Sequence, residues 1–228
     1  MSTASPIRAR RLRLTRTDEC GVPVAEATAN SRITRAAFIT VGLGADVFRS
    51  SDIQVAGADG SICVRSKGVP SLLGYDITIQ FCNYDTAVLE MLLGASILTD
   101  YTTPVEDVGG VISGAGDFNA NTVMVEWWPE NGSNNACATG GTNPQRPFMQ
   151  YIAPRVNRWV VSGNQDFGDA ASLLTLTGYA EGSTAYDASR AGEEVTAADI
   201  AAMNAAEGVL GWREVTALPT AVAAGYDP

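Results

Sequence analysis

The feature that most constrains the fold is a change of period within one short stretch, Asp76 to Gly94. Apolar residues first alternate with polar ones, as in a half-buried strand, and then recur at helical spacing from Thr86 to Leu93. Asn83 or Asp85 can cap the start of the helical pattern, and the closing glycine suits a left-handed stop. The stretch predicts a strand that runs into a short amphipathic helix, which would cover one open face of a sheet.

Several other runs of alternating or β-branched residues predict strands. They are Arg11 to Arg16, Ala37 to Leu43, Ile53 to Arg65 as a hairpin turning at Asp59 and Gly60, Thr122 to Trp128, Pro147 to Ser162 with a bend at Pro154, and Leu173 to Ala180. The glycine-rich segments Thr99 to Asn121 and Pro129 to Pro147 predict loops. Glu194 to Gly208, with Thr196 as its cap, predicts a second helix.

These elements indicate a mainly β fold, either a β sandwich or a barrel-forming sheet of about eight strands. One short helix flanks the sheet, and the second helix lies near the C-terminus. The chain has 228 residues, of which 46% are apolar, enough for one large β domain with a core. We expect a single domain over residues 1–228, with an N-terminal arm at 1–10 and a C-terminal tail at about 217–228.

Charge is distributed unevenly along the chain. Through Pro70 there are ten basic and six acidic residues, and the remainder has five basic and nineteen acidic residues, which together give the net charge of -10. An acidic chain binds nucleic acid poorly, so we interpret the N-terminal arginines as contacts to acidic surface on a neighbouring copy. A nucleic-acid arm is the alternative. The subunit-interface candidates are Arg8, Arg10, Arg11, Arg13 and Arg16.

The chain lacks the usual equipment of catalysis. It has no histidine, which excludes imidazole-based triads and histidine metal sites. Gly42 to Val47 imitates the start of a dinucleotide fingerprint, but no helical pattern follows, so we interpret it as a turn between strands. The four cysteines form no CxxC pair, and we expect them to be buried thiols rather than zinc ligands or disulfides. We therefore expect no catalytic residue, no cofactor and no metal site.

Two other chemistries stay open as alternatives. Close carboxylate pairs can hydrolyse glycosides or bind calcium, although an acidic chain also produces such pairs by chance. These pairs are Glu193 with Glu194, and Asp166 with Asp169. Trp127 and Trp128 are adjacent in a predicted strand, so one of them should point outward, as an interface anchor or a sugar platform.

The sequence contains no segment that predicts a membrane span or an export signal. The longest apolar run, Ala87 to Leu98, is too short to cross a bilayer. No apolar stretch follows the N-terminal arginines, as it would in a secretory signal. We expect the chain to fold in a cytoplasm.

Taken in order, these pieces resemble the major tail tube protein of long, non-contractile-tailed phages, in the form found among phages of actinobacteria. The matching stretches are RLRLTRTDECGVPV (Arg11 to Val24), AFITVGL (Ala37 to Leu43), DGSICV (Asp59 to Val64), ITIQFCNYDTAVLEMLLG (Ile77 to Gly94), VMVEWW (Val123 to Trp128) with Cys137 after it, MQYIAPRVNRW (Met149 to Trp159), and LLTLTGYA (Leu173 to Ala180) with AYD at Ala185 to Asp187. The likeness lies in their order and spacing over nearly the whole chain, and it is least in Ala188 to Gly211.

The resemblance implies a structural virion protein that is not an enzyme. Copies would form homohexameric rings that stack head to tail into the tail tube, and double-stranded DNA would pass through without specific binding. It also implies a tape-measure protein and tail-end proteins as partners, no membrane, and a location in the tail of the virion after assembly in the host cytoplasm. A terminator or baseplate ring protein is the alternative of the same class. A carbohydrate-binding or carboxylate-hydrolase module is the alternative from another class.

Overall fold

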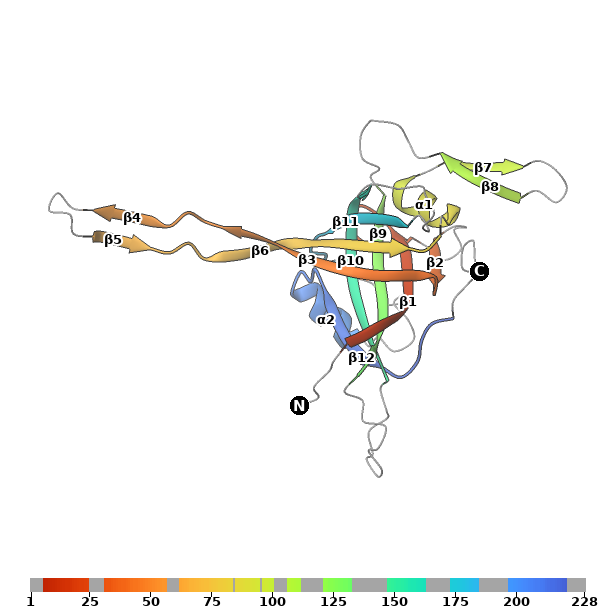
Figure 1. The fold of residues 1–228 in the computed structure, drawn as a ribbon. Coiled ribbons are helices and arrows are strands. Elements are labelled where there is room, and N and C mark those ends of the chain that lie inside the picture. The colour runs from red at the N-terminus through yellow and green to blue at the C-terminus, as the bar shows by residue number, and fades with distance from the viewer. Residues whose placement is uncertain are drawn as a thin grey trace, which may run out of the picture.

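The computed structural model describes residues 6–24, 31–56, 62–83, 85–94, 96–100, 106–111, 121–132, 147–162, 173–184 and 197–220. This part of the chain folds into strands and two short helices (Figure 1). They are β1 (Pro6–Thr17), β2 (Arg32–Arg35), β3 (Phe38–Arg49), β4 (Ile53–Ala56), β5 (Ile62–Ser66), β6 (Pro70–Phe81), α1 (Thr86–Leu93), β7 (Ser96–Asp100), β8 (Glu106–Val111), β9 (Thr122–Asn131), β10 (Phe148–Val161), β11 (Leu174–Ala180), α2 (Ala197–Ala205) and β12 (Gly211–Val215).

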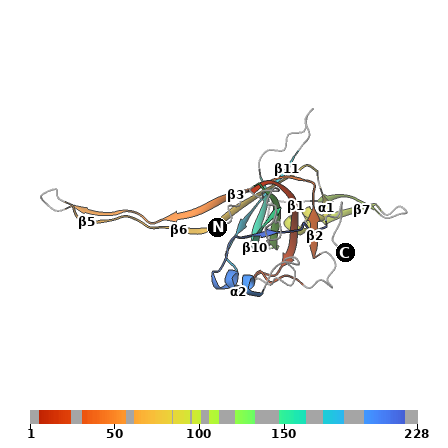
Figure 2. The same ribbon diagram turned by 90° about the horizontal axis from the view of Figure 1, so that it is seen from below.

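The main sheet is antiparallel and rolled. Its strand order is β2-β1-β9-β10-β11-β6-β3, with β12 paired to β10 beside this path. β2 and β3 stand at opposite ends of the order, yet only residues 36–37 separate them in the chain. Because so short a connection spans at most about 11 Å, the sheet has to curl until its two ends approach each other (Figures 1 and 2). The mainly β prediction is confirmed, and the strand order fits a barrel-forming sheet.

Helix α1 packs into the core that the rolled sheet encloses. The sequence pattern places this helix correctly, because both of its end signals are local. Asp85 is the N-cap and accepts hydrogen bonds from two backbone amides, while Gly94 ends the helix in the left-handed region with a φ of 61°. The buried face of α1 joins apolar residues of β1, β2, β6, β9, β10 and β11 in one hydrophobic cluster.

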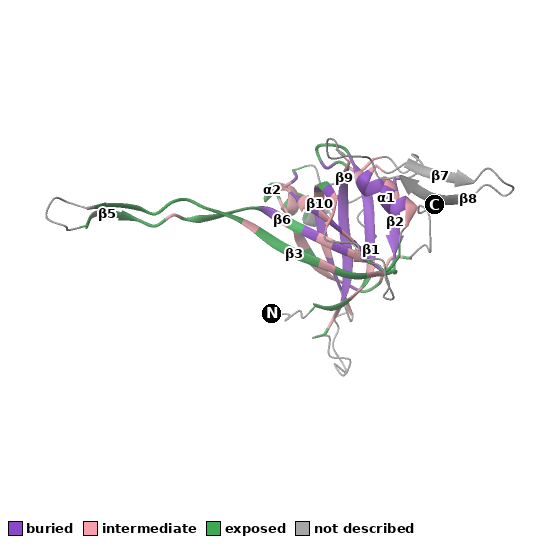
Figure 3. Cartoon of the chain, turned by 45° about the horizontal axis from the view of Figure 1, so that its top comes forward, coloured by how far each residue is buried: buried purple, intermediate pink, exposed green. Residues whose placement is uncertain are grey.

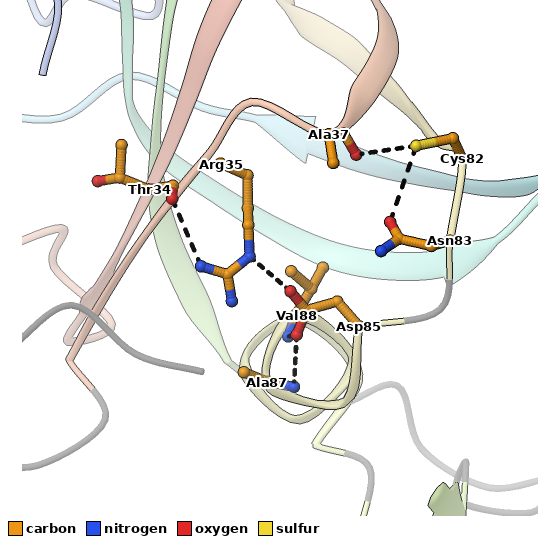
Figure 4. Close-up of polar contacts among 8 residues, drawn as sticks. All are labelled: Thr34, Arg35, Ala37, Cys82, Asn83, Asp85, Ala87 and Val88. Carbon is orange, nitrogen blue, oxygen red and sulfur yellow. Dashed lines mark hydrogen bonds and ion pairs between the residues drawn. The ribbon is translucent and has the colours of Figure 1, made fainter. Parts of the chain in front are cut away.

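The N-cap carboxylate of α1 also pairs with an arginine from the edge of the sheet (Figure 4). Asp85 Oδ1 accepts hydrogen bonds from the amides of Ala87 and Val88, at 3.0 and 3.4 Å. Its other oxygen lies 2.5 Å from Nε of Arg35 on β2. Both side chains are largely buried, so one carboxylate starts the helix and fixes it to β2.

Strand β10 changes partners at the predicted bend. From Phe148 to Ile152 it pairs with β12, and from Val156 onward it pairs with β11 on the same edge. The register with β9 shifts between Ala153 and Val156, around Pro154. Proline has no N–H to donate, so it suits the point where one partner strand ends and the next begins.

Gly178 on β11 leaves room for a buried indole. A Cβ at this position would lie 2.7–2.8 Å from ring carbons of Trp159. We expect Gly178→Ala to lower the free energy of unfolding by about 1–3 kcal/mol, the usual cost of overpacking a core, as measured by urea denaturation. Gly44→Ala is the matched control, because the nearest atom to a Cβ there is 3.7 Å away. Equal losses in the two variants would contradict this account.

The outer parts of β3 and β6, together with β4 and β5, make one long hairpin that projects from the body (Figures 1 and 2). Val47 pairs with Leu72 and Arg49 with Pro70, and the same register continues at Ile53 with Ser66. We call residues 47–56 and 62–73 the extended hairpin. Its two strands approach so closely at Gly68 that a Cβ there would lie 1.9 Å from the carbonyl oxygen of Ser50.

Several elements differ from the sequence predictions. β7 and β8 form a hairpin that includes part of the stretch 99–121, which predicted a loop, and β2 and β12 were not anticipated. β1 begins at Pro6, so part of the expected N-terminal arm is a strand paired with β9. Gly42 to Val47 lies inside β3 and is not a turn. The predicted cap Thr196 and the turn at Asp59 and Gly60 lie outside the described residues. Neither described helix has the length and apolar character that a membrane crossing requires.

Candidate assembly surface

The extended hairpin carries most of the large apolar side chains that the described residues expose. Eight of fourteen such side chains lie on it, and Figure 3 shows the hairpin exposed along its length, in contrast to the buried strands of the body. They are Val47, Phe48, Ile53, Val55, Ile62, Val69, Leu72 and Leu73. Isolated exposed apolar residues are ordinary, whereas a concentration of them marks an interaction surface.

From Ile53 to Val55 this hairpin is amphipathic. Ile53 and Val55 lie on one side of β4 and Gln54 on the other, because successive strand residues alternate. Gln54 pairs with Arg65 of β5, so these two share the polar side. A two-stranded ribbon has no second layer to cover its apolar side and is at best marginally stable alone in water. The described part of the subunit offers no such cover, which points to a partner.

Side chains of the body fix the root of the hairpin. The hydroxyl of Tyr179 on β11 donates to Oδ2 of Asp46 on β3 at 3.0 Å. Desolvation, and then the hydrogen bond and charge of Asp46, raise the pKa of Tyr179, so its hydroxyl stays a proton donor at neutral pH. The guanidinium of Arg158 lies over the aromatic ring of Tyr179, 5.5 Å from the ring centroid. The hairpin therefore leaves the body from a fixed point.

Strand β3 presents a long open edge beside the hairpin. It pairs with β6 over its length, and no described strand pairs with its other edge. Leu43 pairs with the buried Ile77 and therefore lies on the core side of the sheet, yet it is exposed. The strand contains neither proline nor lysine, the residues that commonly protect a free edge. The apolar side of the sheet therefore extends beyond the buried core to the outer edge of β3, where another strand could pair.

One of the five candidate arginines, Arg13, is buried in an ion-pair network within the subunit. It is 5% exposed, and its Nε and terminal nitrogen lie 2.6 and 3.0 Å from the carboxylate oxygens of Glu126 on β9. Gln150 donates to the same carboxylate at 2.6 Å and accepts from Nε of Arg213 at 2.7 Å. Burial raises the pKa of Glu126, although the charge of Arg13 opposes this shift. The expectation that Arg13 contacts a neighbouring copy is wrong, because its charge is satisfied inside the fold.

The other four arginines keep exposed surface but are not a uniform set. Arg10 is exposed and forms an ion pair with Glu130 of its own subunit. Arg11 is half-buried, and its Nε donates to the carbonyl of Pro219 at 3.2 Å. Arg8 is exposed and Arg16 is half-buried on the same strand. For these four the subunit-interface role stays a prediction.

The tryptophans also differ from expectation. Trp127 and Trp128 are both buried, so neither offers an outward platform for a sugar. Trp127 stacks on Tyr151 with ring centroids 5.2 Å apart, and Trp128 lies under the guanidinium of Arg13 at 5.0 Å. The expectation of one outward ring is wrong because both faces of β9 are covered. The exposed tryptophan is Trp212 on β12.

The remaining candidate chemistry finds no support in the described residues. Cys20 and Cys82 are free and exposed, so the expectation of buried thiols is wrong for these two. Within the described ranges, no group of three or more acidic, cysteine or histidine side chains is placed to hold a metal. The carboxylate pairs at 166–169 and 193–194, and Cys137, lie outside the described residues.

Sequence reasoning found the strands of the extended hairpin but not its extent. Ile53 and Ser66 continue the register of Arg49 and Pro70. Extending the pairing of the predicted hairpin inward along that register would have joined four strands into one hairpin. No comparable local signal marks Trp212, since its exposure depends on which strands pair with β10.

No family model and no curated protein matches this chain.

Proposed function

We propose that this chain is a structural virion protein that forms homohexameric rings, and that these rings stack into the tail tube of a phage. The observation that carries the proposal is the extended hairpin, an apolar ribbon that projects from the body without a covering layer. The ordered motifs that resemble tail tube proteins indicate the kind of assembly. The open edge of β3 supports the same role, because pairing between copies removes an exposed strand edge.

A second copy of the chain is the partner that fits the hairpin. The described part of the hairpin carries Arg49, Arg65 and Lys67 against Asp52 alone, so it is basic. The whole chain has a net charge of -10, so another copy offers predominantly acidic surface. A projecting hairpin that docks on a different surface of the next copy makes a head-to-tail contact. Such contacts either close into rings or propagate without limit.

In this role the chain is a conduit and not a catalyst. A wall with a net charge of -10 per copy repels the phosphates of double-stranded DNA, so the genome passes without being bound. A tape-measure protein and tail-end proteins would be its partners, as in the family that the motifs resemble. The protein would assemble in the host cytoplasm and reside in the tail of the virion.

Electron microscopy of the purified chain tests the proposal. We expect rings that stack into hollow tubes of uniform width when the protein is concentrated. Single rings that never stack would instead identify a terminator or baseplate protein. A chain that stays monomeric at every concentration would overturn self-assembly itself.

A polar variant of the hairpin tests the observation on which the proposal depends. Ile53→Gln, Val55→Thr and Ile62→Gln together should abolish polymer formation, as measured by analytical ultracentrifugation. The circular dichroism spectrum should not change, because exposed positions away from special contacts tolerate substitution. Gln54→Thr, on the polar side of the same strand, should assemble like the natural chain. If the triple variant polymerises at the same concentration as the natural chain, the hairpin is not the assembly surface.

A further inference from the structure

Trp212 is the end of an apolar row that crosses the sheet. Leu12 pairs with Trp127, Trp127 with Tyr151, and Tyr151 with Trp212. Paired residues lie on the same side of a sheet, so these four side chains share the face that elsewhere packs on the core. The first three are buried or half-buried, whereas Trp212 is 59% exposed. Trp212, the last residue of the row, is therefore largely uncovered by the described part of the subunit.

Strand β12 holds this side chain in a fixed position. All five of its residues pair with β10, and Arg213 donates to the buried Gln150 at 2.7 Å. Its last residue, Val215, is buried. Met203 of α2 lies against the backbone of Gly211 on the other end of the strand. A large aromatic ring presented on a rigid element is the usual anchor of a protein interface, because little conformational entropy is lost on binding.

The charge around Trp212 is opposite to that of the extended hairpin. The described side chains of residues 201–220 include Glu207 and Glu214 against Arg213, a net charge of 2 acidic minus 1 basic, or -1. The described part of the extended hairpin carries three basic residues and one acidic residue, or +2. Its apolar side offers aliphatic groups for the indole, and its arginines and lysine can lie against the ring face. The two surfaces are complementary in both polarity and charge.

We propose that the extended hairpin of one copy docks on Trp212 and β12 of the next copy. This inference depends on the proposed self-assembly and names the surface that receives the hairpin. The hairpin points away from its own body in both views (Figures 1 and 2), so the contact joins two copies. Because the hairpin and the surface that receives it differ, the interface is head to tail. Any open assembly therefore has one unoccupied hairpin at one end and one unoccupied receiving surface at the other.

Mixing two assembly-deficient variants tests this pairing directly. Trp212→Ser removes the anchor but keeps the hairpin, and the triple hairpin variant Ile53→Gln, Val55→Thr, Ile62→Gln keeps Trp212. At concentrations where the natural chain polymerises, each variant alone should stay monomeric. The critical concentration for polymerisation of Trp212→Ser should be at least about 30-fold above that of the natural chain, as expected for a hot-spot residue. Mixed in equal amounts, they should form a one-to-one heterodimer and no polymer, measured by ultracentrifugation, because only one intact hairpin and one intact anchor remain.

The controls separate this inference from the proposed function. Val22→Ser, at an exposed apolar position outside both surfaces, should polymerise like the natural chain. If Trp212→Ser polymerises normally, or if the two monomeric variants fail to form a heterodimer, the docking inference is wrong while self-assembly stands. If the natural chain never assembles, the proposed function fails first. Circular dichroism of each variant establishes that it is folded before mixing.

Discussion

Replacement of Arg13 by methionine is expected to lower the free energy of unfolding by about 3–5 kcal/mol, the cost of leaving a buried charge without its partner. Glu126 is fully buried on β9, and two nitrogens of Arg13 contact both of its oxygens. Gln150 would remain as a hydrogen-bond donor to the carboxylate but cannot neutralise it. Methionine fills similar volume over Trp128 and removes the charge, so the loss reports on the carboxylate rather than on a cavity.

The loss should grow as the pH rises. Burial holds the pKa of Glu126 above its usual value of 4.5, and removal of Arg13 takes away the main influences that lower it. Between 4.5 and the folded-state pKa, the folded protein binds more protons than the unfolded chain, so stability falls with increasing pH in that window. Urea denaturation of Arg13→Met and the natural protein at about pH 5 and about pH 8 should therefore show the larger difference at the higher pH.

Two further variants serve as controls for Arg13. Arg10→Met breaks an ion pair of similar type with Glu130, but that pair is largely exposed and should contribute under about 1 kcal/mol. Adding Glu126→Leu to Arg13→Met removes the stranded carboxylate and should recover much of the loss, because apolar replacements of buried pairs are often tolerated. Equal effects at Arg10 and Arg13, or no recovery in the double variant, would contradict the burial argument.

Replacement of Asp85 by alanine should have the second large effect on stability, about 3–5 kcal/mol. The substitution removes the N-cap of α1, a loss of about 1 kcal/mol. It also leaves Arg35 without its carboxylate in a position where the arginine side chain is only 3% exposed. The six buried residues of α1 depend on the position of this helix, so the whole core would be affected.

Asp85→Asn separates the two contributions. Asparagine is as good an N-cap as aspartate, so this variant keeps the helix start and loses only the charge opposite Arg35. Its unfolding free energy should fall between those of the natural chain and Asp85→Ala. Asp18→Ala is the comparison at an exposed site, since Asp18 accepts bonds from the amides of Cys20 and Val22 without a buried partner charge. A loss of about 1 kcal/mol or less is expected there, and a loss as large as that of Asp85→Ala would rule out the ion-pair explanation.

Elements with local signals could be predicted closely. The bounds of α1 agree with the sequence pattern at both ends, because the cap, the apolar spacing and the closing glycine all act within one short stretch. β7 and β8 illustrate the opposite case. Gly109 and Gly110 favour a loop by composition, yet they pair with Leu98 and Ile97 across the hairpin. Hydrogen bonds to a partner strand override the local preference, and that partner is not visible in the glycines themselves.

The candidate site shows the same limit. Five arginines near the N-terminus are alike in sequence, but only Arg13 stands opposite Glu126 in the register of β1 and β9. That register buries its charge and removes it from the assembly surface. Similarly, alternation predicts that one of Trp127 and Trp128 faces outward, whereas both sides of β9 are covered in the fold. Alternation assigns a side of the strand, and only the packing of distant segments decides whether that side meets water.

Composition and local pattern were therefore sufficient for the mainly β class and for α1 with its two ends. Local hydrogen bonding and side-chain alternation act over a few residues, so they can be predicted from the sequence alone. The rolled sheet, the buried Arg13 and Glu126 pair, the projecting hairpin and the exposed Trp212 required the tertiary structure. Each depends on pairing between strands far apart in the chain, and the energy of burying a charge or leaving a ring exposed is set only where those strands meet.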